Sequence, residues 1–274
     1  MESYESDFRV SVRGPNYQSH LHGVPMRVGI IGGYGHLGSI LIARIAGEGT
    51  HTAVAVGVDD HPKDHEVDLW VIAVPPQDME GLLGSWCGDE TAPILTFAAG
   101  LPLSYYHSYG CTNVVRAMTN IAAFKGQAMS VWIADEDMSE AANHVRFRSR
   151  IYGFFEMLGP YQEVTDEGRL DTATALIGSG IAYAMRIFQD FVDFGIEDGL
   201  LEDDAILWAQ GTFTGLLSLL PEYTELEDAI NEVASPNGTT EKGLEMLADQ
   251  GASDTLKAAL RVTADRCREL GSLK

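Results

Sequence analysis

A glycine-rich turn is the feature that most constrains how this chain can fold. The segment GGYGHLG contains the pattern Gly33-x-Gly35-x-x-Gly38. It follows MRVGIIG, an apolar run that predicts a strand, and it opens LGSILIARIAGEG, which predicts a helix. An acidic residue, Asp59, stands 21 residues after Gly38, at the end of the next expected strand. Strand, glycine turn, helix and acidic residue in this order are typical of a dinucleotide-binding unit.

The turn has a chemical interpretation and a purely structural one. Glycines let the backbone approach a pyrophosphate, whose charge is stabilised at the helix N-terminus. A carboxylate at the second strand end can accept hydrogen bonds from ribose hydroxyls and would repel a 2′-phosphate. The alternative is a turn that merely packs tightly. We favour cofactor binding, and the predicted contacts are Gly33, Tyr34, Gly35, His36, Leu37, Gly38 and Asp59.

Further strands follow at intervals that suit an α/β domain. TAVAVGV, VDLWVIAV, APILTFAAG, TNVVRAM and AMSVWIAD are short, nearly continuous apolar runs with helical material between several of them. Such runs indicate a parallel sheet covered on both faces, and therefore a Rossmann-like doubly wound domain. Only HPKDHE separates the second strand from the third. That is too short for the usual crossover helix, so we expect the domain to be shortened there.

The pattern changes near Gly168. From Asp171 to Lys274 the sequence shows helical periodicity and no convincing strand. Helices with this many apolar faces need partners, which favours an all-α dimerisation domain. The predicted organisation is a flexible arm (1–25), a dinucleotide-binding domain (26–168) and a helical dimerisation and substrate domain (169–274).

Composition excludes several classes of protein. The chain has 40 acidic and 18 basic residues, a net charge of −22, which disfavours nucleic acid as a partner. Either adaptation to high salt or an ordinary acidic cytosolic protein accounts for this charge. No apolar run approaches a membrane span, and the first 25 residues lack a signal-peptide core, so we expect a cytoplasmic protein. Three widely spaced cysteines argue against a disulfide framework and a structural zinc site.

One polar cluster raises the question of a metal. Asp60, His61, Asp64 and His65 lie close together in the sequence. A solvated loop explains them better, because nothing implies a rigid set of ligands. We therefore predict no metal site.

The segment SPNGTTEKGLEML, residues 235–247, joins a polar loop to an amphipathic helix. It can be read as a turn with an ordinary helix cap. It can equally be a cradle for an anion, because a helix N-terminus presents unpaired N–H groups and the positive end of a dipole.

Several motifs together resemble one family. DTATALIGSGIAY (171–183), AQGTFTG (209–215) and SPNGTTEKGLEML are similar to segments in the C-terminal domain of pyrroline-5-carboxylate reductases. AVPPQDM (73–79) and VVRAMTN (114–120) resemble two segments of the nucleotide domain of that family. The resemblance extends from Met26 to about Leu270.

The resemblance implies an activity and a set of site residues. Hydride would pass from NAD(P)H to the C=N carbon of a cyclic imine carboxylate, giving proline, in a homodimer or an assembly of dimers. Asp59 tilts the expected cofactor slightly toward NADH. The implied catalytic residues are Thr174 and Thr240, Thr174 by the imine nitrogen unless its hydroxyl only bonds back to its own helix. The implied substrate contacts are Ser235, Gly238, Thr239, Thr240 and Asn120, and the further cofactor contacts are Ala73, Val74, Pro75 and Met118.

The chain also departs from the usual family pattern. An extra glycine, Gly32, precedes the turn, and Pro75, Ile121 and Ile181 replace common family residues. These changes suggest a diverged member, which could reduce a related imine in a specialised pathway. Two alternatives remain: a non-catalytic paralogue that binds a ligand or partner, and a dehydrogenase acting on C=O. The second would require a proton donor such as Lys or His. The helical domain contains no His, and its Lys242 follows the polar loop 235–240.

Overall fold

The computed structural model describes residues 24–57, 59–86, 92–135 and 141–272, with the side chains of residues 141–146 left aside. The predicted arm lies outside these residues except for Val24 and Pro25. The described chain divides into two compact units, residues 1–179 with 263–274, and residues 180–262. No helix of the described residues is long and apolar enough to cross a membrane.

A mixed seven-stranded sheet forms the centre of the first unit, with the order β2-β1-β3-β4-β5-β6-β7. The strands β1 to β5 are parallel, β6 is antiparallel to β5, and β7 is parallel to β6. The strands are β1 Arg27–Ile31, β2 Thr52–Val56, β3 Leu69–Ile72, β4 Ile94–Thr96, β5 Val114–Met118, β6 Ser130–Ala134 and β7 Tyr161–Glu163.

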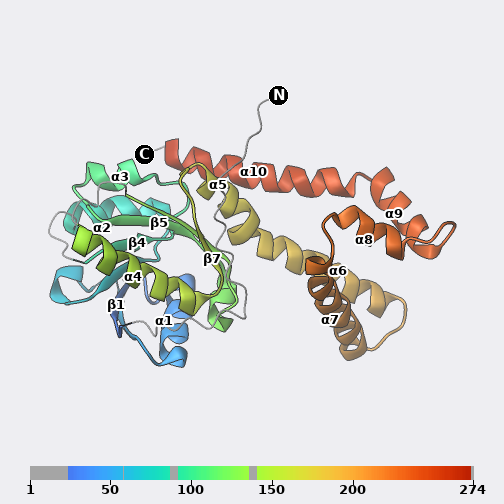
Figure 1. Ribbon diagram of the computed structural model, residues 1–274, viewed down its shortest axis with the longest axis horizontal. Coiled ribbons are helices and arrows are strands. Elements are labelled where there is room, and N and C mark those ends of the chain that lie inside the picture. Colours follow the sequence, from blue (N-terminus) through green and yellow to red (C-terminus); the bar gives the residue numbers. More distant parts are fainter. Residues whose placement is uncertain (1–23, 58, 87–91, 136–140, 273–274) are drawn as a thin grey trace. The chain divides into compact units, whose positions relative to one another are not determined.

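Helices cover both faces of this sheet (Figure 1). The helical elements of the unit are α1 His36–Glu48, η1 Pro62–Asp64, η2 Pro76–Asp78, α2 Met79–Trp86, α3 Leu103–Ser108, η3 Ile121–Lys125, α4 Ala141–Leu158, α5 Arg169–Ala173 and η4 Thr174–Ser179.

Alternate residues of each central strand face opposite helical layers. Leu69 and Val71 of β3 join the core that packs on α1 and α4, whereas Trp70 and Ile72 join the core that packs on α2 and α3. Because a strand alternates its side chains between two faces, a strand buried on both sides must be apolar throughout. The doubly wound fold predicted from these runs is confirmed.

Two features of the sheet concern its edges. The link from β2 to β3 contains only the short helix η1, as the sequence predicted, and both strands flank β1. The strand β7 was not predicted, because its three residues Tyr161, Gln162 and Glu163 form a short, partly polar edge. The antiparallel direction of β6 was not anticipated either.

The second unit is helical throughout. Its elements are α6 Gly180–Glu197, α7 Glu202–Leu219, η5 Leu220–Glu222, α8 Leu226–Val233 and α9 Thr239–Asp249, and α10 Ala252–Ser272 begins here and ends in the first unit. Its own core is small: Val192, Ala205 and Ala209 are its fully buried hydrophobic residues. Many large apolar side chains of α6 and α7 stay exposed.

The cysteines require a correction. Cys267 is a free, buried thiol, but Cys111 is disulfide-bonded, and Cys87 lies outside the described residues. The expectation against disulfide bonding is therefore wrong for Cys111.

Candidate active site

The glycine turn joins β1 to α1 through a residue with a left-handed backbone. Gly32 has a φ of +80°, a conformation that favours glycine. Its N–H bonds to the carbonyl of Val56 at 3.0 Å, and its own carbonyl accepts from Gly35 N–H at 2.8 Å. Gly35 is the N-cap of α1, and no side chain caps this helix. Within the described part of the chain, no side-chain cap occupies the N-terminus of α1, so its free N–H groups are available to another acceptor.

Each glycine of the motif is required by close packing. A Cβ on Gly33 would stand 2.9 Å from Cβ of Ala55, and one on Gly35 would stand 3.1 Å from the carbonyl oxygen of Gly32. At Gly38 a Cβ would overlap that same carbonyl. Close packing therefore explains why these positions are glycines, but it does not explain the open N-terminus of α1.

A cavity of about 820 Å³ adjoins this turn. It lies within the first unit, at the carboxyl ends of β1, β2 and β3, where open α/β sheets bind ligands. Most of its surface is apolar, with a few polar groups, as expected of a cofactor site. The residues lining it are Ile31, Gly32, Tyr34, Gly35, Val56, Gly57, Asp60, His61, Pro62, Val74, Gln77, Asp78, Gly81, Leu82 and Ser85.

Of the two acidic residues that follow β2, Asp60 lines the cavity and Asp59 does not. The carboxylate of Asp60 accepts a hydrogen bond from Gly57 N–H at 3.2 Å, which fixes it just beyond β2. The ring of Tyr34 packs on the same glycine. Tyr34, Gly57 and Asp60 therefore form one corner of the cavity.

The other predicted cofactor residues are distributed around the turn. Val74 lines the cavity, and a Cβ on Gly32 would stand 2.9 Å from the carbonyl oxygen of Ala73. Pro75 is the N-cap of the short helix η2. His36 is exposed at the start of α1, whereas Leu37 packs on the core.

A second group of predicted residues meets at the carboxyl end of β5. Asn120 donates to the carbonyl of Ile177 at 3.2 Å and accepts from Ala122 N–H at 3.0 Å. A Cβ on Gly178 would stand 2.9 Å from the sulfur of Met118. These contacts fasten the turn η4 to the end of β5, and they provide a structural reason for Asn120 as well as for Met118.

Thr174 begins η4, a π-helical turn of six residues. Such turns are rare and are frequent at functional sites. The hydroxyl of Thr174 donates to the carbonyl of Leu170 at 2.8 Å. The thiol of Cys267 lies 3.5 Å from the hydroxyl oxygen of Thr174. The hydroxyl hydrogen is thus bonded back to its own helix, and of the oxygen's two lone pairs one can accept from the Cys267 thiol while the other remains.

The loop before α9 belongs to the second unit. Gly238 N–H bonds to the carbonyl of Ser235 at 2.9 Å, and Gly238 is the N-cap of α9 without a side-chain hydrogen bond. Asn237 has a φ of +58°, and its N–H bonds to the carboxylate of Glu241 at 2.7 Å. The helix begins at Thr239, and Thr240 is half-buried.

The predicted site residues therefore form three groups. The glycine turn with Val74, and the β5 end with Thr174, lie in the first unit, while Ser235, Gly238, Thr239 and Thr240 lie in the second. Sequence reasoning missed Asp60 as a cavity residue, although its position directly after Asp59 was a usable signal. It also missed Gln77, Asp78 and Ser85.

The structure gives no support for a metal centre. Among the described residues, no group of three or more His, Cys, Asp or Glu side chains is arranged to hold a metal ion. His61 accepts from Lys63 N–H at 3.2 Å, in the short helix η1.

Comparison with known families identifies the C-terminal part. Residues 167–270 match the model of the pyrroline-5-carboxylate reductase dimerisation domain. Among curated proteins, the chain is 27% identical over 270 residues to the pyrroline-5-carboxylate reductase of Synechocystis sp., covering 90% of this chain and 98% of that protein. It is 29% identical over 232 residues to the enzyme of Methanosarcina acetivorans, covering 80% of each.

Solved structures agree on the fold. A pyrroline carboxylate reductase from Plasmodium falciparum, with NADP bound, gives a TM-score of 0.80 at 18% identity, covering 90% of this chain and 98% of that one. The enzyme of Streptococcus pyogenes also gives a TM-score of 0.80, at 23% identity, and the match covers 90% of this chain and 100% of that one. The resemblance predicted from the sequence is confirmed.

Proposed function

We propose that this chain, which carries a pyrroline-5-carboxylate reductase dimerisation domain and resembles those reductases over most of its length, is an NAD(P)H-dependent reductase of a cyclic imine carboxylate. Pyrroline-5-carboxylate, reduced to proline, is the first candidate substrate. The observation that carries the proposal is the open N-terminus of α1 beside a cavity of about 820 Å³, in a chain with these relatives.

The residues around the cavity suit a dinucleotide. Backbone N–H groups at the start of α1 would hold the pyrophosphate, because Gly33, Gly35 and Gly38 allow its close approach. The cofactor, when bound, supplies a hydride to the C=N carbon, which turns that double bond into a single bond. The protein's task is then to orient the imine and exclude water.

Asp60 favours NADH over NADPH. Its carboxylate is held in the cavity by Gly57, where it can accept hydrogen bonds from ribose hydroxyls and would repel a 2′-phosphate. Asp78 adds a second carboxylate to the lining, and the described lining contains neither Lys nor Arg. The role expected of Asp59 is thereby assigned to its neighbour.

Thr174 is suited to accept a hydrogen bond from the substrate. A protonated imine carries an N–H. The oxygen of Thr174 donates its own hydrogen to Leu170 and can accept from the Cys267 thiol, and it keeps a second lone pair for that N–H. The back-bonded geometry and a role in the reaction are therefore compatible. The proton stays on the substrate nitrogen during hydride transfer, so no separate proton donor is needed.

The loop 235–240 is the proposed site for the substrate carboxylate. The uncapped start of α9 offers backbone N–H groups, and Thr240 adds a hydroxyl. The nearby carboxylate of Glu241 is already bonded to Asn237 N–H. That bond directs the negative charge of Glu241 toward the loop backbone.

Oxidation of NADH and NADPH by the purified protein, with pyrroline-5-carboxylate at low and high salt, tests the function. We expect saturable turnover, and a loss of about 100-fold in kcat/KM for Thr240→Ala, since oxyanion-type donors contribute that much. Absence of turnover under all conditions would overturn the proline reaction. Cofactor binding would then indicate another imine or a C=O substrate, whereas no binding would indicate a non-catalytic protein.

Dissociation constants of the two cofactors, measured by fluorescence titration without substrate, test the preference. We expect tighter binding of NADH than of NADPH. Asp60→Asn should reduce the ratio of the two dissociation constants by about tenfold, because it removes the repulsion between this carboxylate and the 2′-phosphate. Asp59→Asn is the matched control and should leave the ratio unchanged. An effect at Asp59 and none at Asp60 would restore the original assignment.

A further inference from the structure

The last turns of α10 lie directly against the loop that follows β4. Gly100 has a φ of +82°, and a Cβ there would overlap the carbonyl of Cys267. A Cβ on Gly271 would in turn overlap the carbonyl of Gly100. The two backbones touch without side chains between them. The end of the chain is therefore packed into the first unit.

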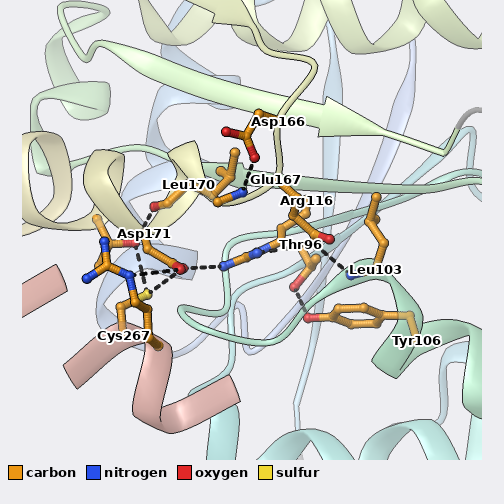
Figure 2. A network of polar contacts seen from close by, with 12 residues as sticks. Thr96, Leu103, Tyr106, Arg116, Asp166, Glu167, Leu170, Asp171 and Cys267 are labelled. Carbon is orange, nitrogen blue, oxygen red and sulfur yellow. Dashed lines mark hydrogen bonds and ion pairs between the residues drawn. The ribbon is translucent and has the colours of Figure 1, made fainter. Parts of the chain in front are cut away.

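A buried ion-pair network extends from this contact (Figure 2). Arg116 of β5 is only 4% exposed, and its two terminal nitrogens reach Glu167 and Asp171, each at 3.1 Å. Glu167 also accepts from Leu103 N–H at 2.7 Å. A buried guanidinium needs such partners, because its desolvation is costly. The network fixes the start of α5 against β5.

The thiol of Cys267 links α10 to this network (Figure 2). Its sulfur lies 3.3 Å from Asp171 and 3.5 Å from Thr174. Cys267 is 2% exposed. Arg268, the next residue, brings its Nε to within 3.9 Å of the other oxygen of Asp171. Asp171 is thus contacted both from β5 and from α10.

These contacts surround the hydroxyl of Thr174. Leu170 accepts its hydrogen on one side, and Cys267 lies against its oxygen on the other. Asp171, one residue after Leu170, holds Cys267 and Arg116 together. A change in any of these groups would let the first turn of η4 move.

We propose that Asp171, Arg116 and Cys267, here called the α10 clasp, are positioning residues that hold Thr174 in its reactive orientation. The proposal rests on the proposed function, because it assigns a purpose to the orientation of Thr174. The residues of the α10 clasp do not line the cofactor cavity, so the affinity for the cofactor does not depend on them. They affect the reaction of the bound substrate instead.

Kinetics of clasp variants test the proposal. Asp171→Ala should lower kcat about tenfold and leave the dissociation constant of NADH unchanged, since a misoriented contact affects the reaction more than the binding. Asp171→Asn keeps the shape and one acceptor oxygen and should recover much of the loss. Likewise Cys267→Ser, which keeps a hydrogen-bond donor, should have a kcat close to that of the unaltered chain. Cys267→Val, which has no donor, should have a lower kcat.

A double-mutant cycle separates positioning from mere stability. If Asp171 acts through Thr174, the variant carrying Thr174→Ala and Asp171→Ala should have the kcat of Thr174→Ala alone. Additive losses would overturn the proposal. Glu163→Gln, which weakens the 2.6 Å ion pair to Arg148 in the same unit, is the control and should leave kcat unchanged.

The outcomes are distinguishable. Absence of turnover in the unaltered chain overturns both the function and the clasp. Turnover that stays the same in Asp171→Ala and Cys267→Val overturns the clasp alone. If Asp171→Ala does not fold, the pair Cys267→Ser and Cys267→Val decides by itself, because a polar donor and an apolar group of similar size are then compared.

Discussion

The ring of Tyr34 packs so closely on Gly57 that a Cβ on this glycine would stand 3.0 Å from Cε2 of the tyrosine. Tyr34 is itself 77% exposed and belongs to the lining of the cavity. Gly57 also donates the hydrogen bond that holds Asp60. This one glycine therefore sets the positions of both side chains at that corner.

Gly57→Ala should consequently weaken NADH binding. The added methyl group must displace the Tyr34 ring and, with it, the corner that includes Asp60. We expect the dissociation constant of NADH to rise about fivefold to tenfold, in line with about 1 kcal/mol of displaced contacts. Gly47→Ala is the control, because nothing lies within 4 Å of a Cβ there. Equal binding by both variants would show that the Tyr34 corner does not contact the cofactor.

The exposed apolar faces of the second unit predict a homodimer. Phe194 of α6 and Leu217 of α7 are 68% and 67% exposed. Large exposed apolar surfaces of this kind mark sites of contact with another protein chain. Light scattering should give at least twice the 29.8 kDa of one chain. Phe194→Glu and Leu217→Glu should shift it toward the monomer, whereas Gln189→Glu, which adds the same charge on α6, should not. A monomeric unaltered chain would contradict the prediction.

Salt should stabilise the protein through its charge. With a net charge of −22, the folded chain repels itself, and added ions screen that repulsion over roughly 10 Å at 0.1 M and roughly 3 Å at 1 M. We expect the unfolding temperature to rise by several degrees between 0.1 M and 1 M KCl. Comparison with sucrose, which acts without screening, provides the control. An unfolding temperature that does not change with KCl would favour an ordinary acidic protein over one adapted to high salt.

Alkaline pH should weaken the α10 clasp. Burial raises the pKa of the Cys267 thiol. A raised pKa stabilises the folded state below the unfolded value of about 8.5 and loses that contribution as pH rises through the folded value. The free energy of unfolding should therefore fall more steeply above pH 9 in the unaltered chain than in Cys267→Ser. Urea denaturation at pH 8 and pH 10 measures the difference, and parallel curves would contradict it.

The parts predicted from the sequence are those fixed by local pattern. The apolar runs gave the strands β1 to β6, and the glycine turn gave the junction of β1 with α1. The direction of β6 could not be predicted, because strand pairing depends on how Thr119 to Met129 return the chain, which no periodicity shows. The edge strand β7 lacks the alternation that would mark it.

The candidate site was predicted in its motifs but not in its contacts. Local spacing identified Thr174, yet its contact with Cys267 joins residues 93 positions apart. Likewise Asp60 and Asp59 are equivalent in the sequence pattern, and only the hydrogen bond from Gly57 distinguishes them. Such distinctions arise from tertiary packing. The domain boundary at residue 168 and the roles of the site residues remain predictions.

The helix α10 begins in one compact unit and ends in the other. The residues that complete the first unit are therefore synthesised after the whole of the second unit. During translation, β1 to η4 can assemble while Cys267 and Gly271 are still missing, so Asp171 initially lacks part of its network. The first unit can therefore reach its final form only after residues 180–262 have been synthesised.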